Sequence, residues 1–295
     1  MTLLGTNSYL LDCGDGQALV IDPGPPIESH AQAIRAEARA RGLTIAAIAL
    51  THGHPDHASG AAAFAAATGA RIYAHPTSRI PHDAELPLEG ELHVGSIALR
   101  TIDAPGHAHD HAIFFLLEEG ALFTGDVILG EGTSVVAPPG GAMRPYQRTL
   151  DRLAREFAGA RTIFGGHGPP VSQPAAKIAE YIAHRRMREE QILAALSDEP
   201  ATIPQLVRRI YSPQRQVLWP AMARQILAYL IALEDEGSVA ARTLYRDFTA
   251  EEAAMLNPRI EEILNPADAA VVIAELGAEL RLESLLEYRL TQGAA

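Results

Sequence analysis

Residues 44–57 read TIAAIALTHGHPDH, a short apolar run that passes directly into three histidines and an aspartate. The apolar part predicts a buried β-strand. The polar part begins where that strand ends, and a packed core has no use for it, because each buried imidazole needs a hydrogen-bond partner. Imidazole and carboxylate are ordinary ligands of zinc and its first-row neighbours. The stretch therefore predicts part of a metal site, with a solvated loop as the alternative.

Short strand-type segments alternate with alanine-rich helical segments on both sides of this stretch, as far as residue 170. The alternation is typical of the α/β class. We expect two strands within residues 7–24, helices at 29–42 and 59–69, a strand at 71–75, two strands within 92–107, a hairpin at 112–126 and a strand at 160–167. From residue 175 the pattern turns helical, with helices predicted at 175–197, 202–211 and 220–237, followed by a strand pair at 238–245.

Three more candidate ligands follow later strands. They are His107 after a Pro-Gly turn, Asp126 at the end of the hairpin and His167 in the segment FGGHG. Glycines flank all three and allow the backbone to bend sharply. Because α/β folds build their sites where strand ends converge, we expect these side chains to meet the first cluster.

The candidate ligands suit two metal ions that share one carboxylate. One group is formed by His52, His54 and His107, a second by Asp56, His57 and His167, and Asp126 can join both. Metal ions about 3.5–4 Å apart can share a bridging hydroxide that forms near neutral pH. The expected activity is therefore hydrolysis by a metal-bridging hydroxide. Asp56 is the candidate catalytic residue, since it can also orient the nucleophile or accept its proton.

These motifs resemble a known family. THGHPDH, followed by GH, GD and GHG, is similar to the signature of the metallo-β-lactamase superfamily over roughly residues 5–172. The resemblance implies an αβ/βα sandwich with a dinuclear, usually zinc, site along one edge, and the same two ligand groups with Asp126 as the bridge. Related proteins carry an opening strand before GTNSYLL, so we expect that this strand is missing or that Met1 is an internal start.

A narrower resemblance reaches to about residue 245. The segments LFTGDVILGEGTSVV, FGGHGPPV and HRRMREEQIL look like the lactamase-β-like endoribonuclease group, in which a C-terminal winged helix follows the sandwich. We therefore expect a catalytic domain at 1–172, a winged-helix-like domain at 173–245 and an acidic helical tail at 246–295. The alternative for 173–245 is a helical cap that packs on the first domain.

Composition and charge limit the compartment and the substrates that we expect. The 295 residues carry a net charge of −12 and a single cysteine, with no signal peptide or transmembrane run, so we expect a cytoplasmic protein. The one basic cluster lies in the helical part and comprises Arg185, Arg186, Arg188, Arg208 and Arg209. The substrate we favour is single-stranded RNA, cleaved as by a phosphodiesterase and gripped by these arginines, because the resemblance includes the appended module. The alternative is a small ester, thioester (hydroxyacylglutathione-like) or lactone, which the acidic surface favours. A homodimer is the assembly we consider besides the monomer.

Four further side chains are candidates for substrate contacts or for supporting the ligands. His111 lies in HDH after His107, and Glu131, Thr133 and Ser134 follow Asp126. A structural hydrogen bond is the competing role for His111. Turn or capping chemistry is the competing role for the other three.

Overall fold

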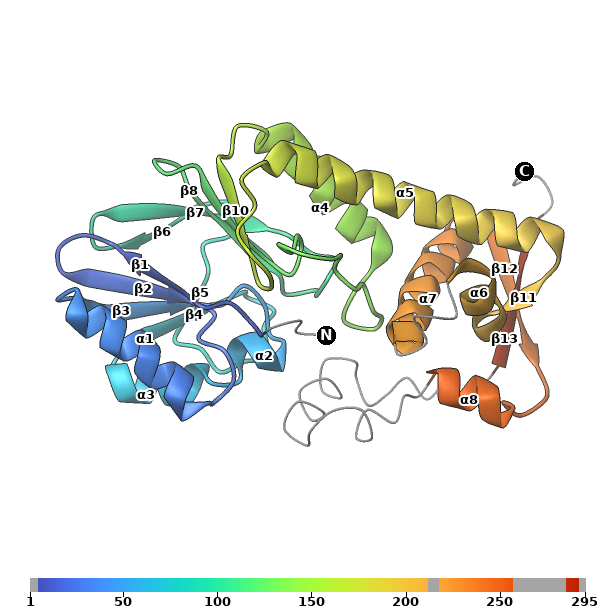
Figure 1. The fold of residues 1–295 in the computed structure, drawn as a ribbon, viewed down its shortest axis with the longest axis horizontal. Helices are drawn as coiled ribbons and strands as arrows, with labels where there is room; N and C mark the ends of the chain where they lie inside the picture. The colour runs from blue at the N-terminus through green and yellow to red at the C-terminus, as the bar shows by residue number, and fades with distance from the viewer. Residues whose placement is uncertain (1–4, 212–217, 257–284, 292–295) are drawn as a thin grey trace.

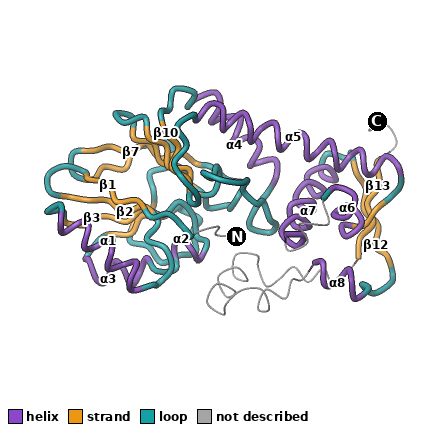
Figure 2. The backbone as a smooth tube through the Cα atoms, viewed as in Figure 1, coloured by secondary structure: helices purple, strands orange, loops and turns teal. Residues whose placement is uncertain are grey.

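The computed structural model describes residues 5–211, 218–256 and 285–291. Two five-stranded sheets face each other in the N-terminal part of the chain (Figures 1 and 2). Their strand orders are β1-β2-β3-β4-β5 and β10-β9-β8-β7-β6. The α/β sandwich that the sequence predicts is thereby confirmed.

The first sheet has its helices on the outer face. In chain order this half comprises β1 (Tyr9–Asp12), β2 (Gln17–Ile21), α1 (Glu28–Ala40), β3 (Thr44–Ala49), α2 (Pro55–Ala58), α3 (Ala61–Thr68), β4 (Arg71–Ala74) and β5 (Ala84–Glu85). Strands β2 to β5 run parallel, and β1 is antiparallel to β2.

The second sheet is largely antiparallel, and only its last strand runs parallel to its neighbour. It comprises β6 (Glu91–Val94), β7 (Ile97–Asp103), β8 (Ala112–Leu116), β9 (Ala121–Gly125) and β10 (Thr162–Gly165), with α4 (Met143–Glu156) between the last two.

Strand β2 shows how the sheets are held together. Its side chains alternate between two faces, as a strand requires. Leu19 and Ile21 pack between the two sheets, together with Phe114 and Phe123 of the second sheet. Residues 18 and 20 point the other way, into the core under α1 and α3. A strand that is apolar on both faces is therefore buried on both, and its carboxyl end is fixed rigidly at the edge where the site lies.

The C-terminal part packs on the outer face of the second sheet. It comprises α5 (Pro174–Asp198), β11 (Ala201–Thr202), α6 (Ile203–Ile210), α7 (Trp219–Asp235), β12 (Val239–Leu244), α8 (Ala250–Leu256) and β13 (Leu285–Leu290). The long helix α5 lies along α4 and continues to α6 and α7 (Figure 1). One continuous apolar cluster runs from Ile113 in the sheet through Tyr181 on α5 to Leu230 on α7. The helical part thus shares its core with the sandwich.

Two sequence predictions for this part are wrong. The predicted strand pair at 238–245 is a single strand, β12. Its partner is β13, which the sequence analysis placed in an acidic helical tail. Strand β13 lies in the centre of a three-stranded sheet of order β11-β13-β12. The error has a physical cause, because residues 285–290 become a strand through pairing with residues far away in the chain, which a local helical pattern does not report. Residues 257–284 and 292–295 of the predicted tail lie outside the described residues.

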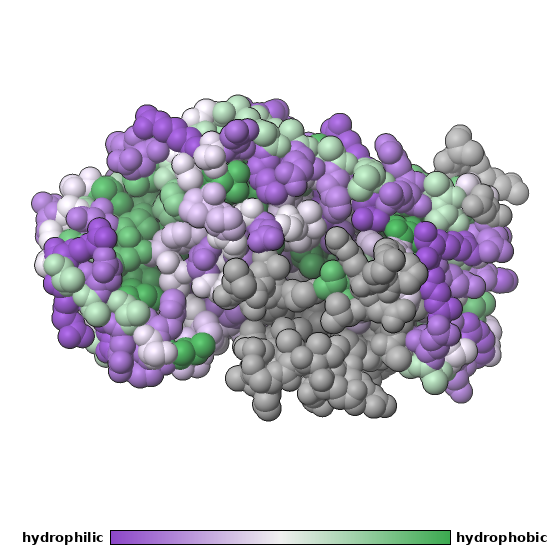
Figure 3. Space-filling view, viewed as in Figure 1, coloured by the Kyte–Doolittle hydropathy of each residue, from purple (hydrophilic) through white to green (hydrophobic). Residues whose placement is uncertain are grey.

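The surface is mostly polar. In the view of Figure 3, hydrophilic side chains cover α1 and α5, and apolar ones show mainly between the strands at the left. Among the described helices, none combines the length and the apolar character needed to cross a membrane.

Candidate metal centre

The predicted ligands come together at one edge of the sandwich. His52 and His54 lie in the loop after β3, and Asp56 and His57 lie on the short helix α2 that follows. The remaining three come from the second sheet: His107 from the loop after β7, Asp126 directly after β9 and His167 just beyond β10. Three groups of these side chains bring their ligand atoms within 4.8 Å of one another, namely His52/His54/His107, His52/His57/Asp126 and Asp56/His57/His167.

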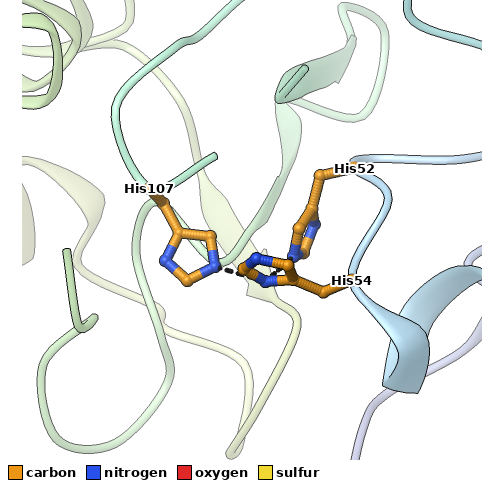
Figure 4. A group of neighbouring side chains, drawn as sticks. All are labelled: His52, His54 and His107. Carbon is orange, nitrogen blue, oxygen red and sulfur yellow. Dashed lines mark hydrogen bonds between the residues drawn. The ribbon is translucent and has the colours of Figure 1, made fainter. Parts of the chain in front are cut away.

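The first group consists of three imidazoles around one point (Figure 4). Nδ1 of His54 lies 2.9 Å from Nε2 of His52 and 3.0 Å from Nε2 of His107. Oδ2 of Asp126 lies 3.7 Å from Nε2 of His107, so this carboxylate reaches the first group.

The second group is richer in carboxylate. Nε2 of His57 lies 3.3 Å from Oδ2 of Asp56 and 3.4 Å from Oδ1 of Asp126. Nε2 of His167 lies 3.3 Å from Oδ2 of each aspartate. Asp126 therefore lies between the two groups. Its Oδ2 faces His107 and His167, and its Oδ1 faces His57.

The hydrogen-bond network fixes where the imidazole protons are. Nδ1 of His107 donates to the carbonyl of Val135, and Nδ1 of His57 donates to Oδ2 of Asp22, both at 2.8 Å. Nδ1 of His167 donates to the carbonyl of Gly5 at 3.0 Å. When Nε2 is deprotonated, as metal binding requires, each ring presents a lone pair to the cluster.

These inward lone pairs lack protein donors. A proton on Nδ1 of His54 can satisfy only one of its two neighbours, so one nitrogen pair there stands lone pair against lone pair. Nε2 of His57 and Oδ1 of Asp126 are buried without any hydrogen-bond partner among the described residues. Buried polar atoms are normally paired. The donor set therefore fits divalent cations, which would satisfy all of these atoms at once.

Electrostatics separate the two groups. Burial lowers the pKa of His52 well below its ordinary value, and burial lowers the pKa of His54 to about 3. In the second group burial acts in the same direction, but the surrounding aspartates outweigh it and raise the pKa of His57 well above its ordinary value. For His167, burial lowers the pKa, yet attraction and hydrogen bonding to Asp126 raise it to about 10 overall. Of the two groups, only the second therefore favours positive charge at neutral pH.

Sequence analysis missed one residue that the site depends on, Asp22. It is buried, and it accepts hydrogen bonds from the backbone N–H of Thr51 at 2.8 Å, from Oγ1 of Thr51 at 2.6 Å and from Nδ1 of His57 at 2.8 Å. Oγ1 of Thr51 in turn lies 3.0 Å from Nδ1 of His52. Asp22 thus orients imidazoles of both groups. The signal was available, since Asp22 ends a strand before a Pro-Gly turn, much as Asp126 follows β9.

The N-terminal segment also supports the site. Oγ1 of Thr6 donates to Oδ2 of Asp56 at 2.6 Å. Nδ2 of Asn7 donates to the carbonyls of Gly165 and Gly168, at 3.0 and 2.8 Å, and so braces the turn that carries His167. Sequence analysis identified none of these contacts.

The glycines around the ligands allow the close approach that the sequence predicts. A Cβ atom at Gly166 would lie 2.2 Å from Oδ1 of Asp126 and 2.6 Å from Cε1 of His57. At Gly106, where φ is +140°, a Cβ atom would lie 2.3 Å from Cα of Tyr146. Side chains at either position would displace a ligand or the helix behind it.

Of the four candidates for substrate contacts or for supporting the ligands, two lie against the ligands and two do not. Nε2 of His111 accepts a hydrogen bond from the backbone N–H of Asp126 at 3.1 Å, and the His111 ring stacks on His52. Oγ of Ser134 lies 3.0 Å from Nδ1 of His107. Both side chains are buried. Glu131 is exposed and Thr133 is half-buried, and neither is brought to the ligands by a hydrogen bond.

Most arginines of the predicted basic cluster are buried, ion-paired or stacked on an aromatic ring. Arg185 is buried, with 1% of its surface exposed. Arg208 pairs with Glu251 at 2.6 Å, and Arg209 pairs with Glu199. The guanidinium of Arg188 lies over the ring of Tyr211, 4.2 Å from its centre. An arginine run on a predicted helix usually indicates a solvated face, and this interpretation fails for Arg185, because the helix is buried against the sandwich on that side.

Two facing sheets with such a histidine–aspartate cluster at their common edge define an αβ/βα sandwich with a candidate metal site. The sequence model of the metallo-beta-lactamase superfamily matches residues 1–167, and the chain belongs to that superfamily.

Several relatives extend the match beyond the sandwich. The "Beta-lactamase-like protein 2 homolog" of Drosophila melanogaster is 33% identical over 81% of this chain and 85% of its own length. The "Atrochrysone carboxyl ACP thioesterase AacuM" of Aspergillus aculeatus is 36% identical over 66% of this chain and 61% of its own length. Among solved structures, a metallo-beta-lactamase family protein from Thermus thermophilus superposes with a TM-score of 0.68 at 27% identity, covering 80% of this chain and 91% of that one. The family and its thioesterase-named members identify the chain as a hydrolase.

Proposed function

We propose that this chain hydrolyses thioesters or related small esters with two divalent metal ions, which we expect to be zinc. Two observations carry the proposal. Nε2 of His57 and Oδ1 of Asp126 are buried without a hydrogen-bond partner among the described residues, and the imidazole nitrogens of His52, His54 and His107 face one another. A closed structural zinc site uses four ligands. Seven ligand side chains in two groups instead leave coordination positions for water and substrate.

The roles of the residues follow from their contacts. Two bound metal ions would supply a water of lowered pKa and would polarise the carbonyl under attack. His52, His54 and His107 would hold one ion, and Asp56, His57 and His167 the other, while Asp126 reaches both groups.

Asp56 is also the proposed catalytic residue. Its Oδ2 is held by Thr6 at 2.6 Å, which fixes the carboxylate beside the place where the nucleophile forms. A carboxylate fixed there can orient the attacking water and accept its proton.

Charge favours a small substrate over a polyanion. The net charge is −12, and of the arginines once considered for phosphate contacts, Arg185 is buried while Arg208 and Arg209 are ion-paired. Thioesters also fit the names of several relatives. The second candidate is a phosphodiesterase for single-stranded RNA. It is supported by the sheet β11-β13-β12 with helices α5 to α7, which we interpret as a winged-helix-like module.

The test compares both substrates on one zinc-loaded preparation. We expect turnover of an acyl-thioester panel, loss of that turnover with a chelator, and no cleavage of single-stranded RNA. The triple change Arg186→Gln, Arg208→Gln and Arg209→Gln serves as the matched variant, and Arg185 is left intact because it is buried. RNA cleavage whose log–log salt slope falls by about 0.7 for each lost phosphate contact would favour the RNA function and reject the thioester proposal.

A further inference from the structure

Helix α5 lies outside the region that supplies the ligands, yet it contacts the segment that orients one of them. Residues 129–135 lie within the connection from Asp126 to α4, and two of them hold His107. The carbonyl of Val135 accepts from Nδ1 of His107 at 2.8 Å, and Oγ of Ser134 lies 3.0 Å from the same atom. The position of this segment therefore sets the direction of the His107 lone pair.

Two side chains of α5, one helical turn apart, hold the same segment. Nη2 of Arg185 donates to the carbonyl of Ser134 at 2.6 Å. The hydroxyl of Tyr181 accepts from the backbone N–H of Leu129 at 2.9 Å and lies 3.2 Å from the carbonyl of Gly132, to which it donates. Residues four apart lie on the same face of a helix. This face of α5 thus fixes both ends of the segment behind His107.

Burying Arg185 costs free energy of folding. It is 1% exposed, and its Nε and Nη1 have no hydrogen-bond partner among the described residues. Its guanidinium lies 4.9 Å from the ring centre of Tyr146, which offers a cation–π contact but no carboxylate. No described carboxylate pairs with this cation, and burying an unpaired charge is expensive; replacing buried charge with a well-packed apolar side chain is often neutral or stabilising. Stability alone does not account for an arginine here.

We propose that Arg185, assisted by Tyr181, is a positioning residue that orients His107 through the backbone of Ser134 and Val135, so that the C-terminal helix tunes metal binding at the His52/His54/His107 group. The inference rests on the proposed metal-dependent function and deepens it. It makes α5 part of the metal centre, because substituting a residue that orients a metal ligand commonly lowers metal affinity by about 10- to 100-fold.

The test is zinc binding by Arg185→Met, measured by competition with a chromophoric chelator, together with the cobalt(II) spectrum of the same protein. Arg185 borders a cavity of about 340 Å³ between α4 and α5, so the flexible methionine has room to fit. We expect one zinc ion to bind about tenfold more weakly, the other unchanged, and the cobalt spectrum altered. The melting temperature of the metal-free protein should stay the same or rise. Arg185→Lys, which keeps a donor, should recover part of the affinity.

Arg144→Met is the matched control. Arg144 of α4 also joins α5 to its surroundings, through Glu189 at 2.5 Å and through Glu236, directly after α7, at 2.7 Å, but it makes no hydrogen bond to residues 129–135. It should leave both zinc affinities unchanged. If Arg185→Met binds both ions as the wild type does, or weakens both only in parallel with a fall in melting temperature, the positioning role is rejected. If that variant does not fold, Tyr181→Phe gives the same readout, and unchanged zinc affinity there rejects the proposal.

The two proposals fail separately. Wild-type protein that binds two zinc ions but cleaves no thioester would overturn the proposed substrate and leave the role of Arg185 intact. Thioester hydrolysis by the wild type, with normal zinc binding in Arg185→Met, would overturn only the positioning role.

Discussion

Replacing Asp22 with asparagine should damage both stability and the metal site. The amide can keep one oxygen toward the N–H of Thr51, where Oδ1 now accepts at 2.8 Å. Its NH₂ then takes the place of Oδ2, which at present accepts from Oγ1 of Thr51 at 2.6 Å and from Nδ1 of His57 at 2.8 Å. Donors would face donors at both contacts.

The magnitude follows from these lost bonds. A hydrogen bond to a charged group is worth about 1.5–3 kcal/mol, and two are lost with partial relaxation, so unfolding of the metal-free protein should become easier by about 3 kcal/mol. For a cooperative unit of about 150–250 residues this corresponds to a fall in melting temperature of roughly 6–12 °C. His57 can relieve the clash only by leaving Nδ1 unprotonated and keeping a proton on Nε2, the atom that faces Asp56 and Asp126. Zinc affinity of that group should then fall by about 10- to 100-fold.

Thermal melts by circular dichroism in chelator, followed by zinc titration of the folded protein, measure both effects. Asp12→Asn is the matched control, because the Asp12 carboxylate is exposed and accepts only from the N–H of Gly14. It should change stability by no more than about 0.5 kcal/mol. A melting temperature and zinc affinity of Asp22→Asn equal to those of the wild type would refute the argument that Asp22 orients the site.

Three further outcomes are expected. Gly166→Ala should weaken zinc binding by about tenfold or more in a chelator competition, because its Cβ would lie 2.2 Å from Oδ1 of Asp126, whereas Gly159→Ala, which has open space, should not. Asp126→Ala should bind fewer than two zinc ions by elemental analysis and hydrolyse thioesters at the background rate, and near wild-type turnover would contradict its bridging role. The two groups should differ in pH dependence. In the metal-free protein His167 has a pKa of about 10 and His57 a pKa well above its ordinary value, so zinc binding there displaces protons and its affinity should rise at least tenfold per pH unit from pH 6 to 9, while the group of His54, with a pKa of about 3, should show little change. Calorimetry in buffers of different ionisation enthalpy counts the released protons, and equal release at both groups would refute the assignment.

The ligands could be predicted from the sequence because their signal is local. Residues 44–57 join a continuous apolar strand to a cluster of histidines, and His107 and His167 each follow a strand and a glycine. Strand ends in a two-layer sheet structure meet at one edge, so residue type and strand position together predict the cluster. The α/β class followed from the same alternation.

Supporting contacts depended on the tertiary structure, because they join residues that are distant in the chain. Asp22 meets His57 across 35 positions, and Arg185 meets Ser134 across 51. In the sequence Arg185 is one of several arginines on a predicted helix, a pattern that indicates a solvated face. Only the packing of α5 against α4 and α7 buries it and directs it to the segment behind His107.

Strand β13 shows the same limit in the fold. Residues 285–290 carry an alternation too short to separate a strand from an amphipathic helix. They form a strand because β11 and β12 offer backbone donors and acceptors on both sides. Local composition thus determined which residues can bind metal and which segments can be strands. Which partners orient these residues and segments was decided by long-range backbone pairing and by contacts of buried charged side chains. Only the folded chain supplies both.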